Sequence, residues 1–229
     1  ARGKPGHGSF LHDDNAVTKV AEAVARLGNH TFPLTLTDTV RTFLARMSEL
    51  TGLEFPEDDL EGAIAKLGPI GRIVGATIRD TANPTMLKAG YKANVIPSVA
   101  EAVVDCRVIP GREEAFLREV DELLGPDVTR EWVTDLPPVE TEFEGPLTDA
   151  MIAALKTHDE GSTAIPYMLS GGTDAKSFHT LGMRCYGFAP LRLPPDLDFA
   201  SLFHGIDERV PVDALTFGTR VLDTFLRNC

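Results

Sequence analysis

Two histidines stand beside glycines near opposite ends of the sequence. Residues 6–9 read Gly-His-Gly-Ser, and residues 204–208 read His-Gly-Ile-Asp-Glu. An imidazole can donate or accept a hydrogen bond or bind a metal ion, and adjoining glycines let the backbone approach a ligand closely. This context singles out His7 and His204. The remaining histidines are interpreted as solvated or turn residues: His12, His30, His158 and His179.

Two polar side chains in the middle of the sequence are suited to holding a substrate. Asn94 opens the segment Asn-Val-Ile-Pro, and its amide can donate hydrogen bonds. Arg107 follows later, and its guanidinium can bind a carboxylate through two hydrogen bonds. Each residue also has a simpler interpretation. Asn before an apolar-Pro turn often serves the turn itself, and Arg107 can form a surface ion pair with Asp105.

A third candidate is the glycine pair at residues 171–173. Gly171, Gly172 and Thr173 follow an apolar segment and precede a helical pattern around residues 175–179. Backbone N–H groups at such a strand-to-helix turn can face a carboxylate or an oxyanion. A tight turn without a ligand explains the same spacing equally well.

Other catalytic patterns are absent or incomplete. Residues 3–9 lack the order of a phosphate-binding loop, and the glycines of residues 68–75 miss the dinucleotide spacing. A zinc site needs three or four ligands, and neither H-E-x-x-H nor paired cysteines occur. A serine hydrolase using Ser9 or Ser170 is disfavoured because the sequence assigns neither a base nor an orienting residue to them.

Hydrophobic periodicity predicts an α+β layer in the first part of the chain. Helical spacing covers residues 15–27, with Gly28 as the expected stop, and two further helices occupy 37–67. The alternation across 98–108 predicts a half-buried strand, with Ala100, Ala102, Val104, Cys106 and Val108 on its inner face. We also expect a helix over 116–124 and strands at 70–80 and 127–134.

The pattern changes after the break at Leu136-Pro137-Pro138. A helical stripe covers residues 147–158, and Pro211 is expected to begin a final helix. The apolar segments 164–169 and 183–188 are typical of buried strands. The second part therefore resembles a few βα units without the rest of their sheet.

Composition excludes several classes of partner. The 229 residues carry a net charge of −12, which disfavours nucleic-acid binding, and no apolar run is long enough to span a membrane. Three widely spaced cysteines predict reduced thiols, no structural disulfide and a cytoplasmic location.

Taken in order, the motifs are more specific than any one alone. The Gly-His-Gly-Ser segment, Asn94 with Arg107, the Gly171–Thr173 turn and the His204 segment together resemble the dinuclear-zinc amidohydrolase superfamily. That superfamily includes aminoacylase-1, carboxypeptidase G, carboxypeptidase S-type peptidases and succinyl-diaminopimelate desuccinylase. The resemblance implies an α+β lid, which also dimerises, followed by part of an α/β zinc-hydrolase catalytic domain.

The resemblance also implies a role for each candidate residue. His7 matches the lid histidine that stabilises the transition state, usually across a dimer interface, and His204 matches the last zinc ligand. Asn94, Arg107 and the Gly171–Thr173 turn match substrate-binding positions. Residues 1–135 then correspond to the lid, with a helical insert at about 31–68, and residues 136–229 correspond to the C-terminal portion of the catalytic domain.

Parts of the superfamily pattern are absent from this sequence. The H-x-D segment, the bridging Asp and the Glu-Glu pair with the general base precede the lid in the superfamily. The intact enzyme would bind two zinc ions and cleave an amide bond in a peptide or N-acyl amino acid as a homodimer. We expect the chain as given to be a fragment with an incomplete zinc site and no activity alone. The alternative is a non-catalytic dimerisation or ligand-binding module.

Overall fold

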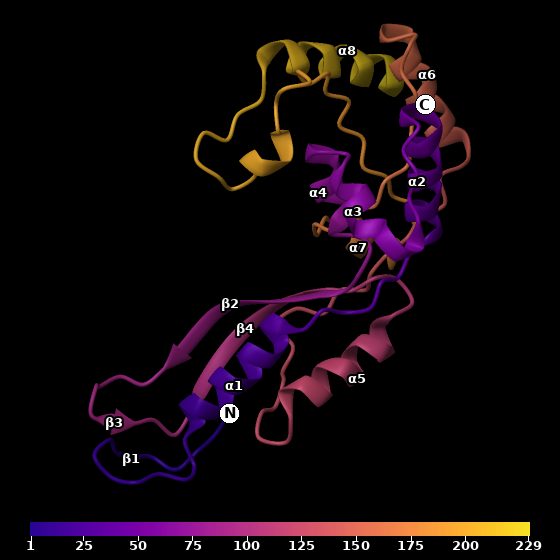
Figure 1. Cartoon of the computed structure of the whole chain (residues 1–229). Helices are drawn as coiled ribbons and strands as arrows, with labels where there is room; N and C mark the ends of the chain where they lie inside the picture. The colour runs from indigo at the N-terminus through magenta and orange to yellow at the C-terminus, as the bar shows by residue number, and fades with distance from the viewer. The chain divides into compact units, whose positions relative to one another are not determined.

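The computed structural model describes all residues, 1–229, as a mixed α/β chain with two compact units (Figure 1). The first unit combines residues 1–35 with residues 79–138. The second combines residues 36–78 with residues 139–229. Each unit is therefore built from two stretches that are distant in sequence.

The first unit contains two small antiparallel sheets. Strand β2 (Thr81–Ala89) pairs with β4 (Ala100–Arg107), from Ala89 opposite Ala100 to Thr81 opposite Arg107. The pairing is irregular between Pro84 and Met86, as expected where a proline cannot donate to the ladder. The second sheet joins the two-residue strands β1 (Gly6–His7) and β3 (Val95–Ile96).

Two helices cover one face of the longer sheet (Figure 1). They are α1 (Ala16–Asn29) and α5 (Glu113–Leu124). Asn15 caps α1, since its side-chain oxygen accepts a hydrogen bond from the backbone N–H of Val17 at 2.9 Å. The sequence correctly predicts both helices, although α1 continues past Gly28 to Asn29.

Apolar side chains of these helices pack against the inner face of β4. Phe116 is 1% exposed, and its ring lies 5.1 Å from that of Phe32. Val104 and Cys106 border the cluster of Phe116 and Phe32, while Ala100 is buried in a second cluster beside α1. The predicted alternation of β4 is therefore confirmed. Burying a side chain of the size of Phe stabilises the fold by about 1.5–3 kcal/mol.

The second unit is helical. In chain order its elements are α2 (Asp38–Thr51), η1 (Glu57–Asp59), α3 (Leu60–Ala65), α4 (Pro69–Gly75), α6 (Pro146–His158), α7 (Ala175–His179), η2 (Phe199–Leu202) and α8 (Val212–Asn228). The helical pair expected within 37–67 is confirmed by α2 and α3. Helices α2, α3 and α4 share a buried cluster that includes Val40, Leu60 and Val74.

Four expected strands are not formed. Residues 69–75 form helix α4, which has Pro69 in its first turn, and no strand occurs at 127–134, 164–169 or 183–188. Helix α4 forms despite its β-branched residues, because Pro69 favours a helix start and the helix buries Val74. The other three segments are apolar, but a strand also needs a neighbour for its backbone hydrogen bonds, and the structure gives them none.

The observed architecture agrees with the expected class at the level of small antiparallel sheets covered by helices. The division into lid and catalytic portions at residue 135 stays a prediction, because the compact units reflect contacts within this chain alone. None of the helices has the combination of length and apolarity that a membrane crossing requires.

Candidate functional site

His7 lies in the short antiparallel pairing of β1 with β3, at one end of the first unit (Figure 1). In the β1–β3 sheet, His7 is opposite Val95 and Gly6 is opposite Ile96. The backbone N–H of Gly8 continues this pairing by donating to the carbonyl oxygen of Asn94 at 2.9 Å. The main chain thus brings together two candidates that are 87 positions apart in sequence.

Both ring nitrogens of His7 have a polar neighbour. Nε2 lies 3.2 Å from the amide nitrogen of Asn94, and Nδ1 lies 2.7 Å from the hydroxyl oxygen of Ser9. The ring of Phe10 is 5.7 Å away, centroid to centroid. These neighbours orient the imidazole. All four side chains are exposed, so a ligand can reach the ring.

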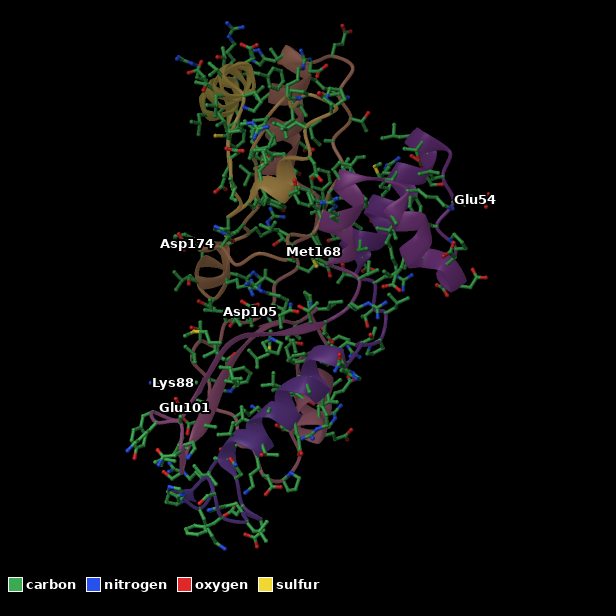
Figure 2. All side chains as sticks on the ribbon, turned by 60° about the vertical axis from the view of Figure 1, so that its left-hand side comes forward. Glu54, Lys88, Glu101, Asp105, Met168 and Asp174 are labelled. Atoms are coloured by element: carbon green, nitrogen blue, oxygen red, sulfur yellow. The ribbon has the colours of Figure 1, made fainter.

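Arg107 lies at the opposite end of the β2–β4 ladder from this tip. Figure 2 shows Lys88 and Glu101, which face each other in the register, toward one end and Asp105 toward the other. Strand β4 spans about 23 Å, at about 3.3 Å per residue. Within one chain, Arg107 therefore lies far from His7 and Asn94.

The surroundings of Arg107 are those of an ion pair. Its Nη2 atom donates to Oδ2 of Asp105 at 2.8 Å, and both side chains are partly exposed. Cys106, between these two residues, points to the other face of the strand. Its burial and, to a lesser extent, the negative charge of Asp105 raise the pKa of its thiol. This environment favours the neutral thiol, so Cys106 is poorly suited to act as a nucleophile.

The glycine turn belongs to the second unit. Gly171, Gly172 and Thr173 are exposed and lie in an irregular segment before α7. The carbonyl oxygen of Thr173 accepts a hydrogen bond from the backbone N–H of Lys176 at 3.3 Å, which begins this five-residue helix. The helix after these residues is formed, but the strand expected before them is not, and their role as a ligand site stays a prediction.

His204 is also in the second unit, between η2 and α8. Its φ is +57°, and that of Asp207 is +64°, a left-handed conformation that is unfavourable for residues other than glycine. The backbone N–H of Gly205 donates to the carbonyl oxygen of Leu202 at 3.0 Å and helps to hold this turn. His204, Asp207 and Glu208 are all exposed.

The residues of this chain do not by themselves fit a zinc ion. Nowhere in residues 1–229 do three His, Cys, Asp or Glu side chains form a group suited to hold a metal. Protein zinc sites use three or four such ligands. His204 can supply at most one of them, so no step of a reaction is assigned to a metal here.

The structure shows contacts that sequence reasoning missed. Ser9 was considered only as a nucleophile, whereas it is a hydrogen-bond neighbour of His7; the spacing of two residues within a turn was the available signal. His30 and His158 are expected to be solvated or turn residues; both are partly buried, so neither is simply solvated. Nε2 of His30 lies 2.7 Å from Glu119, and Nε2 of His158 lies 2.7 Å from Thr224.

The first part of the chain matches a known protein family. The profile of the peptidase dimerisation domain matches residues 1–127, which is more than half of the chain. The chain therefore belongs to that family. It is a member of the M20 superfamily of metallopeptidases and related amidohydrolases that its motifs resemble.

Individual relatives are similar over nearly the whole chain. Human N-fatty-acyl-amino acid synthase/hydrolase PM20D1 is 26% identical over 97% of this chain and 46% of its own length. The dipeptidase Dug1p from Saccharomyces cerevisiae superposes with a TM-score of 0.64 at 13% identity, over 99% of this chain and 52% of its own. The metallo-carboxypeptidase Sso-CP2 from Sulfolobus solfataricus gives 0.57 at 17% identity, over 98% and 59%. The chain spans about half the length of the curated relatives it matches.

Proposed function

We propose that this chain is the substrate-contacting, dimer-forming part of a zinc-dependent hydrolase that cleaves an amide bond in a peptide or an N-acyl amino acid. The observation that carries the proposal is the His7–Asn94 contact at the β1–β3 tip, within the residues that match the peptidase dimerisation domain. The names of the similar proteins, an acyl-amino acid hydrolase, a carboxypeptidase and a dipeptidase, support this substrate class.

The proposed roles follow from the chemistry of each side chain. His7 donates an N–H to the oxygen that becomes negative when the amide carbon turns tetrahedral, a stabilisation that acts mainly in the transition state. Asn94 orients His7 and contacts the same oxygen. Arg107 of one copy binds the substrate carboxylate with its paired N–H groups, while His7 and Asn94 come from the other copy. The backbone of residues 171–173 is proposed as a further substrate contact.

His204 is proposed as one zinc ligand of the whole protein. The segment at residues 204–208 supports this role through its resemblance to the superfamily motif.

The exposed edge of β2 is proposed as the contact between two copies of the chain. β2 pairs only with β4, and Asn83 through Ala89 are exposed. Met86 and Leu87 are 66% and 61% exposed, an unusual position for two apolar residues on a strand edge. Unpaired strand edges are normally covered, and pairing two edges across a twofold axis covers both.

Replacing Leu87 by lysine is expected to convert the dimer into a monomer, because two buried charges would face each other across the proposed edge. Light scattering at micromolar concentration measures the mass. If His7 acts across the interface, the monomer of the whole protein should also lose turnover of N-acyl amino acids. Val133, which is 86% exposed in the same unit and is not part of β2, provides the control Val133→Lys. Equal effects of the two variants, or a monomeric wild type, would contradict this role of β2.

A further inference from the structure

Ser9 contacts a single nitrogen of His7 through two different groups. Its backbone N–H donates to Nδ1 at 3.3 Å, and its hydroxyl oxygen lies 2.7 Å from the same atom. The turn that brings them together is closed by a hydrogen bond from the Phe10 N–H to the His7 carbonyl oxygen at 3.1 Å. The approach of Ser9 to the ring is therefore set by the main chain.

The backbone N–H determines which ring nitrogen carries the proton. An amide N–H can only donate, so Nδ1 must present its lone pair and is unprotonated in the neutral ring. The serine hydroxyl can donate or accept, and it joins the same arrangement by directing its O–H at Nδ1. Neutral His7 consequently carries its proton on Nε2.

The environment of Nε2 accommodates that proton once the Asn94 amide is assigned accordingly. The amide nitrogen of Asn94 lies 3.2 Å from Nε2, but two donors cannot face each other, and a half-turn of the group exchanges its nitrogen and oxygen. Asn94 then presents Oδ1 to the Nε2–H and directs its NH₂ outward. The Asn94 NH₂ is then the donor left open at the tip, and the Nε2–H becomes available to a ligand when it leaves Oδ1.

We propose that Ser9 is a positioning residue that holds His7 in the tautomer with its proton on Nε2. The tautomer is a property of this chain alone. Its catalytic meaning rests on the proposed function, in which the Nε2–H is the donor aimed at the substrate oxyanion.

The test is the tautomer of His7 in the ¹⁵N-labelled chain. Long-range ¹H–¹⁵N correlation spectra at alkaline pH, with the signal assigned by His7→Gln, should show unprotonated Nδ1 and protonated Nε2. Ser9→Ala keeps the backbone N–H but removes the hydroxyl, and it should shift the ratio toward the Nδ1–H form by about 2- to 10-fold, the equivalent of one hydrogen bond. Ser9→Thr should restore the wild-type ratio. Ser48→Ala in α2 serves as the control.

A protonated Nδ1 in the wild type, or an unchanged ratio in Ser9→Ala, would overturn the inference. The outcome is distinguishable from failure of the proposed function, since the spectra do not measure turnover. The expected tautomer together with an undiminished kcat for His7→Ala in the whole protein would support the positioning role of Ser9 and contradict the proposed role of His7.

Discussion

Replacing His7 by alanine in the whole hydrolase is expected to lower kcat by about 100- to 1,000-fold, the usual cost of removing one donor to a developing oxyanion. KM should change little, because the interaction is made mainly in the transition state. Steady-state kinetics on N-acyl amino acids, with metal content measured on the same samples, separates this role from a metal defect.

His7→Gln provides the matched variant, because its amide retains an N–H donor on a side chain of similar reach. It should therefore lose less activity than His7→Ala. An alanine variant with the wild-type kcat, or one that loses its metal, would remove the evidence for a donor role.

Replacing Asp80 by alanine is expected to destabilise the first unit by about 3–5 kcal/mol, since it removes the buried carboxylate that pairs with the half-buried Arg112 and with a backbone N–H. The Asp80 side chain is 0% exposed. Its two oxygens accept from the backbone N–H of Ile109 at 2.7 Å and from Nε of Arg112 at 2.9 Å. Nη2 of Arg112 is buried without a hydrogen-bond partner and lies 3.6 Å from Glu119.

A second Asp–Arg pair makes the comparison sharp. Asp121 accepts from two nitrogens of one guanidinium, Nε and Nη2 of Arg130, at 2.6 and 3.0 Å, but its side chain is 54% exposed. Asp121→Ala should cost no more than about 1 kcal/mol. Urea unfolding of the two variants measures the difference, and equal losses would show that burial of Asp80 does not determine its contribution.

The longer helices and the strand β4 could be predicted from the sequence because each buries one face with a regular period, whereas α4 was expected to be a strand. β2 could not, since its sequence, Thr-Ala-Asn-Pro-Thr-Met-Leu-Lys-Ala, contains strand-breaking residues and no clear alternation. Its conformation depends on pairing with β4. The opposite error occurred at residues 164–169 and 183–188. Their apolar composition is typical of strands, but they have no pairing partner here and form none.

The residue types of the candidate site could be predicted from the sequence, but their arrangement in space only in part. The glycines around His7 drew attention to it, but its contact with Asn94 depends on the pairing of β1 with β3. Local spacing carries no information about such a long-range register. Arg107 was grouped with Asn94 by sequence, whereas strand β4 separates the two by its full length.

The central claim is that this chain belongs to a metal-dependent amide hydrolase, and turnover by the whole protein tests it most directly. The protein would be assayed on N-acyl amino acids and dipeptides, then after chelation, and again after Zn²⁺ is restored. The account predicts hydrolysis that is lost on chelation and recovered with the metal. Hydrolysis that is indifferent to chelation, or no hydrolysis of either substrate by the metal-loaded dimer, would contradict it and favour a non-catalytic dimerisation or ligand-binding module.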